Sequence, residues 1–166
     1  MKIRKSTEKD ITDIMSVYEK ARSFMKLNGN GTQWGDNWPP IEIIKNDIKN
    51  KNHYVLTHEE KIVGCFYYTY GMEDDTYKNY NNIWISDTPY GVIHRLASSG
   101  EAKGVGEFII NWVYNDCHHV RIDTHENNIP MRNLLKKLGF TYCGTIDINV
   151  KDNILSDTKR LTFEKT

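Results

Sequence analysis

Apolar residues recur every three or four positions between residues 11 and 25, and this spacing predicts an amphipathic helix. Ser6 or Thr7 stands just before the segment and can act as its N-cap. A shorter helix is predicted over Ile41–Ile48, because its isoleucines recur on one face. The stretch between the two helices, Asn28–Pro40, is rich in Gly, Asn, Trp and Pro and is therefore predicted to be a loop.

From residue 53 onward the hydrophobic pattern changes to that of strands. Two runs of β-branched and aromatic residues flank the polar turn His58–Lys61, which is typical of a β-hairpin. Further strands are predicted at Lys2–Arg4, Asn82–Ser86, Gly91–Ala97, Val120–Thr124, Phe140–Ile148 and Arg160–Lys165. Helices are predicted over Gly104–Tyr114 and Pro130–Leu138, and Gly139 closes the second as a left-handed cap. This order predicts one domain over residues 1–166 of the α/β (α+β) class, with helices on the faces of a mixed sheet.

Composition and charge narrow the class of protein. Hydrophobic residues make up 39% and charged residues 27%, which fits a globular domain. The 22 basic and 22 acidic residues give a formal net charge of zero, which argues against a nucleic-acid partner. No apolar stretch is long enough to span a membrane, and residues 1–10 lack the apolar core of a signal peptide. We therefore expect no membrane association and a cytoplasmic location.

Metal and disulfide chemistry are not expected. The cysteines Cys65, Cys117 and Cys143 are odd in number and form no C-x-x-C pair, which predicts reduced thiols. The adjacent pair His118-His119 is a poor metal site, because neighbouring strand residues point to opposite faces. The sequence therefore predicts no catalytic metal.

A glycine-rich turn, Ser98–Gly106, joins a predicted strand to a predicted helix. Glycines let successive N–H groups converge, and the helix adds its own unpaired N–H groups and the positive end of its dipole. Such a turn can bind a pyrophosphate, or it can simply reverse the chain. The pattern G-x-G-x-x-G is broken at Ile109, and G-x-x-x-x-G-K-[ST] is absent. These failures disfavour a dinucleotide dehydrogenase and a nucleoside triphosphatase.

A second segment, residues 121–140, runs from a strand through a polar turn into a helix that ends in Leu-Gly-Phe. Together the two segments resemble the GNAT superfamily of acyl-CoA-dependent N-acetyltransferases. Glu101–Gly106 is similar to the family's R/Q-x-x-G-x-G/A pyrophosphate loop, and Asn128, Met131 and Leu135 match the spacing of its Asn-led helix. The element order also matches over most of the chain. The resemblance implies a mostly antiparallel sheet of about six to seven strands flanked by about four helices.

The resemblance implies that acetyl-CoA is the cosubstrate and that its acetyl group passes directly to a primary amine of a small molecule or peptide. The residues implied in binding acetyl-CoA are Leu96, Ala97, Ser98, Lys103, Gly104, Val105, Gly106, Asn128 and Met131. Two positions depart from the family. Glu101 replaces an arginine or glutamine, and Leu135 replaces the tyrosine that usually protonates the leaving thiolate.

His94 stands two residues before Leu96, where many family members carry a base-like glutamate, and the resemblance makes it a candidate general base. Its ordinary pKa, about 6.5, suits proton acceptance near neutral pH. The alternative is a half-buried strand histidine that only packs. Asp123 is a second catalytic candidate, with an ion pair to Arg95 or Arg121 as the alternative interpretation.

The acceptor pocket is predicted in the loop Asn28–Pro40. Trp34 and Trp38 would supply apolar walls and Asp36 a countercharge for a cationic amine. The alternative is a loop that its tryptophans pin to the body of the protein. Two other functions stay open, an acyl-CoA-binding sensor without catalysis and a transferase of another acyl group. The acceptor and the oligomeric state are also open, with a homodimer through the C-terminal strands as one alternative.

Overall fold

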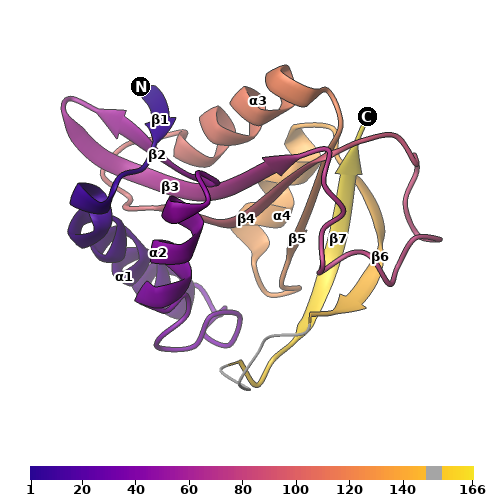
Figure 1. Cartoon of the computed structure of the whole chain (residues 1–166). Helices are drawn as coiled ribbons and strands as arrows, with labels where there is room; N and C mark the ends of the chain where they lie inside the picture. The colour runs from indigo at the N-terminus through magenta and orange to yellow at the C-terminus, as the bar shows by residue number, and fades with distance from the viewer. Residues whose placement is uncertain (149–154) are drawn as a thin grey trace.

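The computed structural model describes residues 1–148 and 155–166. A seven-stranded sheet in the order β1-β2-β3-β4-β5-β7-β6 forms its centre (Figure 1). Its strands are β1 (Lys2–Lys5), β2 (His53–His58), β3 (Lys61–Tyr70), β4 (Gly91–Ser98), β5 (Val120–Thr124), β6 (Thr141–Asp147) and β7 (Lys159–Lys165). Among these strands β4 and β5 run parallel, and the other neighbouring pairs are antiparallel. The predicted mixed, mostly antiparallel sheet is confirmed.

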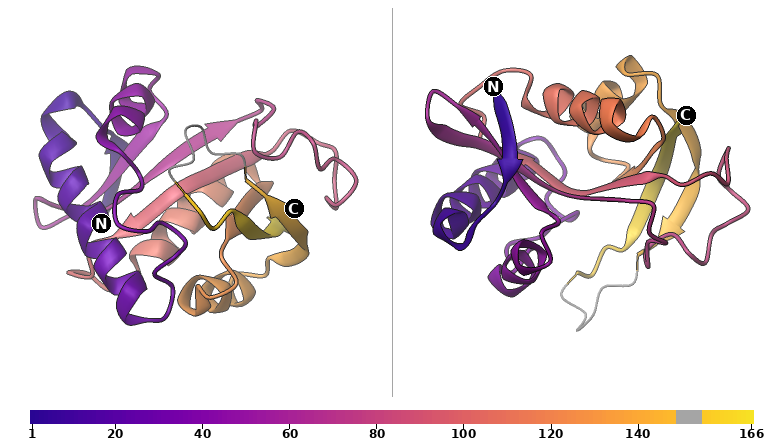
Figure 2. Two further views of the ribbon diagram at one scale, coloured as in Figure 1. Left: turned by 90° about the horizontal axis from the view of Figure 1, so that it is seen from below. Right: turned by 45° about the horizontal axis from the view of Figure 1, so that its top comes forward.

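Helices cover both faces of the sheet. They are α1 (Ile11–Leu27), which follows a short 3-10 turn, α2 (Ile41–Lys49), α3 (Val105–Cys117) and α4 (Ile129–Lys137). In Figure 2, α1 and α2 lie on one side of the sheet and α3 lies on the opposite side. In the described part of the chain, none of these helices is both long and apolar enough to cross a membrane.

Each helical layer buries its own apolar core against the sheet. On the α3 and α4 side the core includes Phe66, Ile93, Ile109, Ile122 and Leu135. On the α1 and α2 side it includes Ile14, Tyr18, Ile44, Val55 and Ala97. The buried positions of α1 are spaced three or four residues apart, as the sequence pattern predicts. Strand β4 contributes to both cores, with Ile93 in the first and Ala97 in the second.

The predicted strand Asn82–Ser86 is wrong. These residues lie in the irregular segment between β3 and β4. The ring of Trp84 packs edge-on against Tyr77 at 5.0 Å, and the Ile85 N–H donates to the carboxylate of Glu164 rather than to a neighbouring strand. The apolar side chains that suggested a strand serve instead to bury an irregular segment against the sheet.

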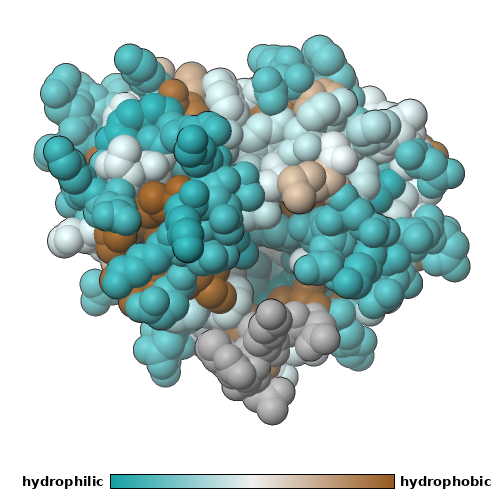
Figure 3. Space-filling view, viewed as in Figure 1, coloured by the Kyte–Doolittle hydropathy of each residue, from teal (hydrophilic) through white to brown (hydrophobic). Residues whose placement is uncertain are grey.

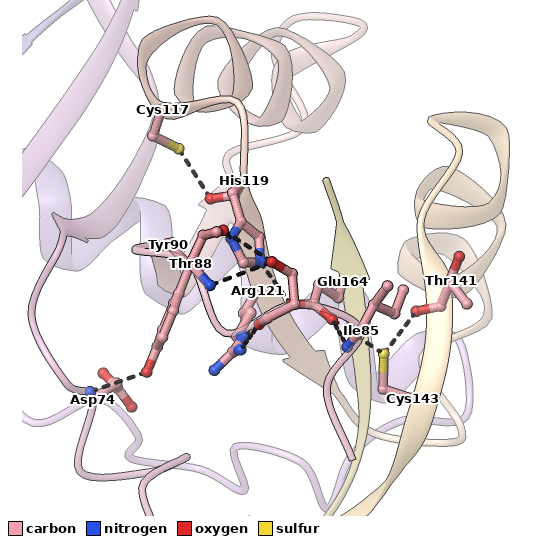
Figure 4. A network of polar contacts seen from close by, with 11 residues as sticks. Asp74, Ile85, Thr88, Tyr90, Cys117, His119, Arg121, Thr141, Cys143 and Glu164 are labelled. Atoms are coloured by element: carbon pink, nitrogen blue, oxygen red, sulfur yellow. Dashed lines mark hydrogen bonds and ion pairs between the residues drawn. The ribbon is translucent and has the colours of Figure 1, made fainter. Parts of the chain in front are cut away.

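A buried polar network ties this segment to the sheet (Figure 4). Glu164 of β7 is fully buried, and its Oε1 atom lies 2.6 Å from Nε2 of His119 and accepts a hydrogen bond from Nε of Arg121 at 3.1 Å. Arg121 also donates to the carbonyl of Ser86 at 2.6 Å. Because a buried carboxylate is stable only when paired, these contacts hold Ile85 and Ser86 beside β5 and β7.

Candidate active site

The parallel pairing of β4 and β5 stops halfway along β4. Of the described residues, β4 pairs with β5 over Gly91–Ile93. Beyond this point β4 has a β-bulge, in which two residues, Arg95 and Leu96, lie opposite the single residue Phe66 of β3. A bulge bends its strand, and the two halves of the sheet diverge visibly in Figure 1. Part of one edge of β4 is therefore left without a strand partner.

Arg95 holds the bulge in a strained conformation. Its φ of +52° lies in the left-handed region that few side chains adopt. Its carbonyl accepts a hydrogen bond from the Tyr18 hydroxyl at 2.9 Å, and its guanidinium donates to Asp47 at 2.6 Å. The guanidinium also stacks over the ring of Tyr67 at 4.7 Å. Contacts from α1, α2 and β3 thus stabilise the bulge.

We expect Tyr18→Phe to lower the free energy of unfolding by about 1–3 kcal/mol, because it leaves buried polar groups without a partner. The groups are the Arg95 carbonyl and Nε2 of His53, which lies 3.3 Å from the hydroxyl. Urea unfolding followed by circular dichroism measures the change. Tyr142→Phe is the matched control, because its hydroxyl is exposed and contacts Thr145. Equal stability of the two variants would contradict the anchoring role of Tyr18.

A cavity of about 810 Å³ lies where the strands diverge. Figure 3 shows the surface hollowed between the α1–α2 side and the β5–β7 side of the molecule. Its wall comes from α1, the loop 28–40, β4, β5, α3, α4 and β7. The predicted site residues on this wall are Trp34, Trp38, His94, Leu96, Ala97, Ser98, Gly106, Asp123, Asn128 and Met131. The structure therefore brings candidates from five separate segments to one cavity.

Four predicted residues lie outside this wall. Asp36 is exposed and forms an ion pair with Lys26, so the structure does not bring it to the cavity as a countercharge. Lys103 and Gly104 are exposed on the turn before α3, and Val105 is buried in the core. Gly104 takes the left-handed conformation, with φ of +74°, at the N-cap of α3.

The turn before α3 leaves the N-terminus of this helix open. Gly100 also has a positive φ, +80°, and no side chain caps α3. The first N–H groups of the helix are thus available to an anion. The unexpected Glu101 forms an ion pair with Lys20 of α1 at 3.1 Å, which offsets its negative charge. No local pattern predicts this contact between α1 and the turn before α3, because the two residues are 81 positions apart.

His94 lies between two carboxylates on the cavity wall. Its Nε2 atom is 3.0 Å from Oδ2 of Asp74, and its Nδ1 atom is 3.6 Å from Oδ2 of Asp123. Asp123 also accepts a hydrogen bond from the buried hydroxyl of Tyr77 at 2.7 Å. The segment between β3 and β4 supplies both Asp74 and Tyr77, and sequence reasoning missed both.

The alternative interpretation of Asp123 as an ion-pair partner of arginine is wrong. Arg95 pairs with Asp47, and Arg121 pairs with Glu164. Asp123 instead contacts His94 and Tyr77, as described above. Its carboxylate therefore remains on the cavity wall beside the candidate base.

The neighbouring carboxylates control the protonation of His94. Burial alone would lower its pKa, but Asp74 and then Asp123 outweigh burial and raise the pKa above its ordinary value. Burial opposes ionisation of Asp74 as well, yet His94 and Thr76 lower its pKa to about 2. The neutral form of His94, which can accept a proton, is therefore reached at a higher pH than for an isolated histidine.

Leu135 has no access to the cavity. Its side chain is fully buried in the core between the sheet and α3 and α4, and Leu134 lines the cavity instead. A different group, or none, must therefore protonate a leaving group in the cavity. Thr124 also lines the wall, and its buried hydroxyl has no hydrogen-bond partner among the described residues.

The loop 28–40 both packs against the protein and lines the cavity. Trp34 is buried and packs edge-on against Tyr18 at 5.8 Å. Arg22 donates to the carbonyl of Trp38 at 3.1 Å, and Asn128, the N-cap of α4, donates to the side chain of Gln33 at 3.1 Å. The tryptophans therefore do both things that were considered: they line the cavity, and they attach the loop 28–40 to the rest of the protein.

In residues 1–148 and 155–166, no three His, Cys, Asp or Glu side chains are arranged to hold a metal ion. The two adjacent histidines have different roles. His118 is the C-cap of α3 and has the left-handed conformation, whereas the side chain of His119 contacts Glu164 of β7.

Solved structures share this fold over nearly the whole chain. An acetyltransferase of the GNAT family from Streptococcus agalactiae 2603 is 27% identical, with a TM-score of 0.81, and the match covers 99% of this chain and 94% of that one. A ribosomal-protein-alanine N-acetyltransferase from Brucella melitensis is 16% identical, with a TM-score of 0.66 and 99% of both chains covered. A phosphinothricin acetyltransferase from Sinorhizobium meliloti, in complex with acetyl-CoA, is 13% identical, with a TM-score of 0.63 and coverage of 99% and 86%. Neither the models of protein families nor the curated proteins give a match.

These matches, together with the bulge in β4 and its divergence from β5, assign the chain to a superfamily. The chain belongs to the GNAT superfamily of acetyltransferases, and it is an acyltransferase enzyme.

Proposed function

We propose that this enzyme transfers an acetyl group from acetyl-CoA directly to a primary amine. The observation that carries the proposal is the cavity at the divergence of β4 and β5, because its wall combines the unpaired edge of β4 with His94 and Asp123. An acyl donor can enter between the strands while an amine approaches from the side of the loop 28–40.

The cavity and the turn before α3 fit acetyl-CoA chemically. The uncapped N–H groups at the start of α3 suit the pyrophosphate. Apolar side chains of Leu96, Met131 and Leu134 suit the pantetheine arm, and Gly106 leaves room beside them. A backbone N–H of the bulged segment of β4 would stabilise the oxyanion that forms on the acetyl carbonyl.

His94 and Asp123 are proposed to prepare the amine. A primary amine arrives protonated at neutral pH, and its ammonium is attracted by the carboxylate of Asp123. Neutral His94 accepts one proton, and the free amine then attacks the thioester carbonyl. The new C–N bond forms, the C–S bond breaks, and the CoA sulfur leaves as a thiolate. The second proton of the nitrogen passes to this thiolate, and His94 returns the first proton to solvent.

Departure of the thiolate without a tyrosine is chemically acceptable. An ordinary thiol has a pKa of about 8.5, so the thiolate is a moderate leaving group near neutral pH. The unpaired Thr124 hydroxyl can donate a hydrogen bond to a group bound in the cavity. Leu135 then contributes only to the core.

Asp74→Asn is expected to shift the acidic limb of the pH profile of kcat/KM to lower pH. Asp74 raises the pKa of His94, so its removal lets His94 become neutral, and able to accept a proton, at a lower pH. Initial rates of CoA release between pH 5 and 9 measure the shift. Asp75→Asn is the matched control, because Asp75 is exposed and contacts Lys78 rather than His94. A limb that stays in place would exclude His94 as the group that titrates.

The proposed function is tested by incubating the protein with acetyl-CoA and a broad panel of primary amines. Release of CoA together with a product heavier by one acetyl group would support it. Calorimetric binding of acetyl-CoA without turnover of any amine would favour the acyl-CoA-binding sensor. Turnover with a different acyl-CoA alone would favour a transferase of another acyl group, and mass spectrometry of the product distinguishes these outcomes.

A further inference from the structure

Arg160 of β7 is a buried cation on the cavity wall that the proposed chemistry does not use. Its side chain is almost fully buried, yet within residues 1–148 and 155–166 no carboxylate forms an ion pair with it. Its guanidinium donates to three backbone carbonyls, those of Asp157 (3.0 Å), Lys159 (2.7 Å) and Gln33 (2.8 Å). Because a guanidinium has five N–H donors, two remain without a partner in the described part of the chain.

A buried charge without a counterion is unfavourable unless a ligand supplies one. Burial lowers the pKa of Arg160, and the carboxylates of Asp123 and Asp157 act in the opposite direction without contacting it. An arginine nevertheless stays protonated in proteins. The free donors of Arg160 are therefore suited to an anion that enters the cavity, and two N–H groups match the two oxygens of a carboxylate.

Arg160 and Asp123 face the cavity from neighbouring strands. Asp123 of β5 pairs with Thr162 of β7, and Arg160 lies two residues before Thr162, on the same face of the sheet. Such diagonal neighbours have Cβ atoms about 7 Å apart. A carboxylate for a cationic amine and a guanidinium for an anion thus lie side by side on the wall.

Asn30 adds a second unpaired polar group at this end of the cavity. Its side chain is buried and lines the wall, and its Oδ1 atom has no hydrogen-bond partner among the described residues. Its Nδ2 atom donates at 2.7 Å to the side chain of Gln33, the residue whose carbonyl holds Arg160. The loop 28–40 therefore presents an unused acceptor on the cavity wall, beside the residue that accepts a hydrogen bond from Arg160.

We propose that the acceptor amine also carries a carboxylate, as a free amino acid does, and that Arg160 binds this carboxylate while Asp123 and His94 face the amine. The inference rests on the proposed function. The close spacing of Asp123 and Arg160 favours an amine and a carboxylate on the same small molecule. A peptide N-terminus has an amide in place of that carboxylate and would leave Arg160 without a partner.

The test compares matched acceptors at a fixed acetyl-CoA concentration. Each L-amino acid of a panel is paired with its α-carboxamide and with the amine that lacks the carboxyl group, and CoA release gives kcat/KM. We expect the best amino acid to exceed its amide by about 30-fold or more, the size of effect found for buried charge pairs. Acids with longer spacers between amine and carboxylate, such as β-alanine, measure the preferred spacing.

Arg160→Gln is expected to abolish this preference by raising KM for amino acids, so that the ratio of kcat/KM between an amino acid and its matched amide falls to about one. Arg132→Gln is the matched control, because Arg132 of α4 also donates to a backbone carbonyl but does not line the cavity. If circular dichroism shows that Arg160→Gln does not fold, the proposal is tested by the wild-type enzyme alone, through its kcat/KM for amino acids and for their matched amides.

The outcomes separate the two proposals. Turnover of amines with equal kcat/KM for acids and amides would overturn the role of Arg160 and leave the acetyltransferase in place. A variant that keeps the full preference would overturn it as well. Absence of turnover with every amine would refute the proposed function and this inference with it.

Discussion

Replacing Gly106 with glutamate is expected to weaken the binding of acetyl-CoA by at least about 100-fold, because juxtaposed like charges cost several kcal/mol. Gly106 lies in the first turn of α3 and lines the cavity. A Cβ atom added there would lie 3.0 Å from Cδ2 of Leu134 and 3.9 Å from Cδ2 of Leu96, so a longer side chain enters the proposed acetyl-CoA path. Calorimetric titration with acetyl-CoA measures the change.

The helix itself tolerates this substitution. A carboxylate in the first turn interacts favourably with the helix dipole, so Gly106→Glu should remain folded. Gly106→Gln has the same length without the charge and should lose less affinity, which separates repulsion from bulk. A folded Gly106→Glu protein with the affinity of the wild type would show that the cofactor does not pass this turn.

His94→Gln is expected to lower kcat by about 100-fold or more, the contribution typical of a general base. Glutamine can keep a hydrogen bond to Asp74 but cannot accept a proton at neutral pH. The affinity for acetyl-CoA should stay close to that of the wild type, because the change concerns the amine. Stopped-assay rates at saturating acetyl-CoA and a calorimetric titration give the two quantities.

His58→Gln is the matched control for this variant, because His58 ends β2 on the surface and does not line the cavity. Its turnover should equal that of the wild type. Equal turnover of His94→Gln at every pH would instead show that His94 only packs between its two carboxylates.

The fold was largely predictable because its strands and helices carry strong local patterns. The isoleucine face of α2, the polar turn after β2 and the glycine at the end of α4 each specify local structure without help from distant residues. Asn82–Ser86 has the composition of a strand, but among the described residues it pairs with no strand, and the Ile85 N–H donates to the carboxylate of Glu164. Such a tertiary contact overrides a local preference and leaves no trace in the local sequence.

The site was predictable where it depends on motif spacing and unpredictable where it depends on distant pairs. Leu96, Gly106 and Asn128, which motif spacing indicated, line the cavity, and their binding of acetyl-CoA stays a prediction. The partner of His94 is Asp74, 20 residues away in an irregular segment, and nothing in that segment marks it. The anchoring of Arg160 at the loop 28–40 brings together residues more than 120 positions apart, as its bond to Gln33 shows.

Asp36 and Leu135 show the limits of reasoning from residue type and motif position. Asp36 has the charge for an acceptor site, but its loop directs it outward to Lys26. Leu135 occupies the motif position of a catalytic tyrosine, yet it is fully buried in the core. Which side of a helix or loop faces a cavity is decided by packing with other elements, and that information is spread over the whole chain.

A crystal structure of the protein with acetyl-CoA bound tests the central claim most directly. We expect the pyrophosphate at the turn before α3, the pantetheine arm between the diverging β4 and β5, and the acetyl group beside Leu96, facing His94 and Asp123. An acetyl group bound away from the divergence of β4 and β5, or facing neither His94 nor Asp123, would contradict the proposed mechanism.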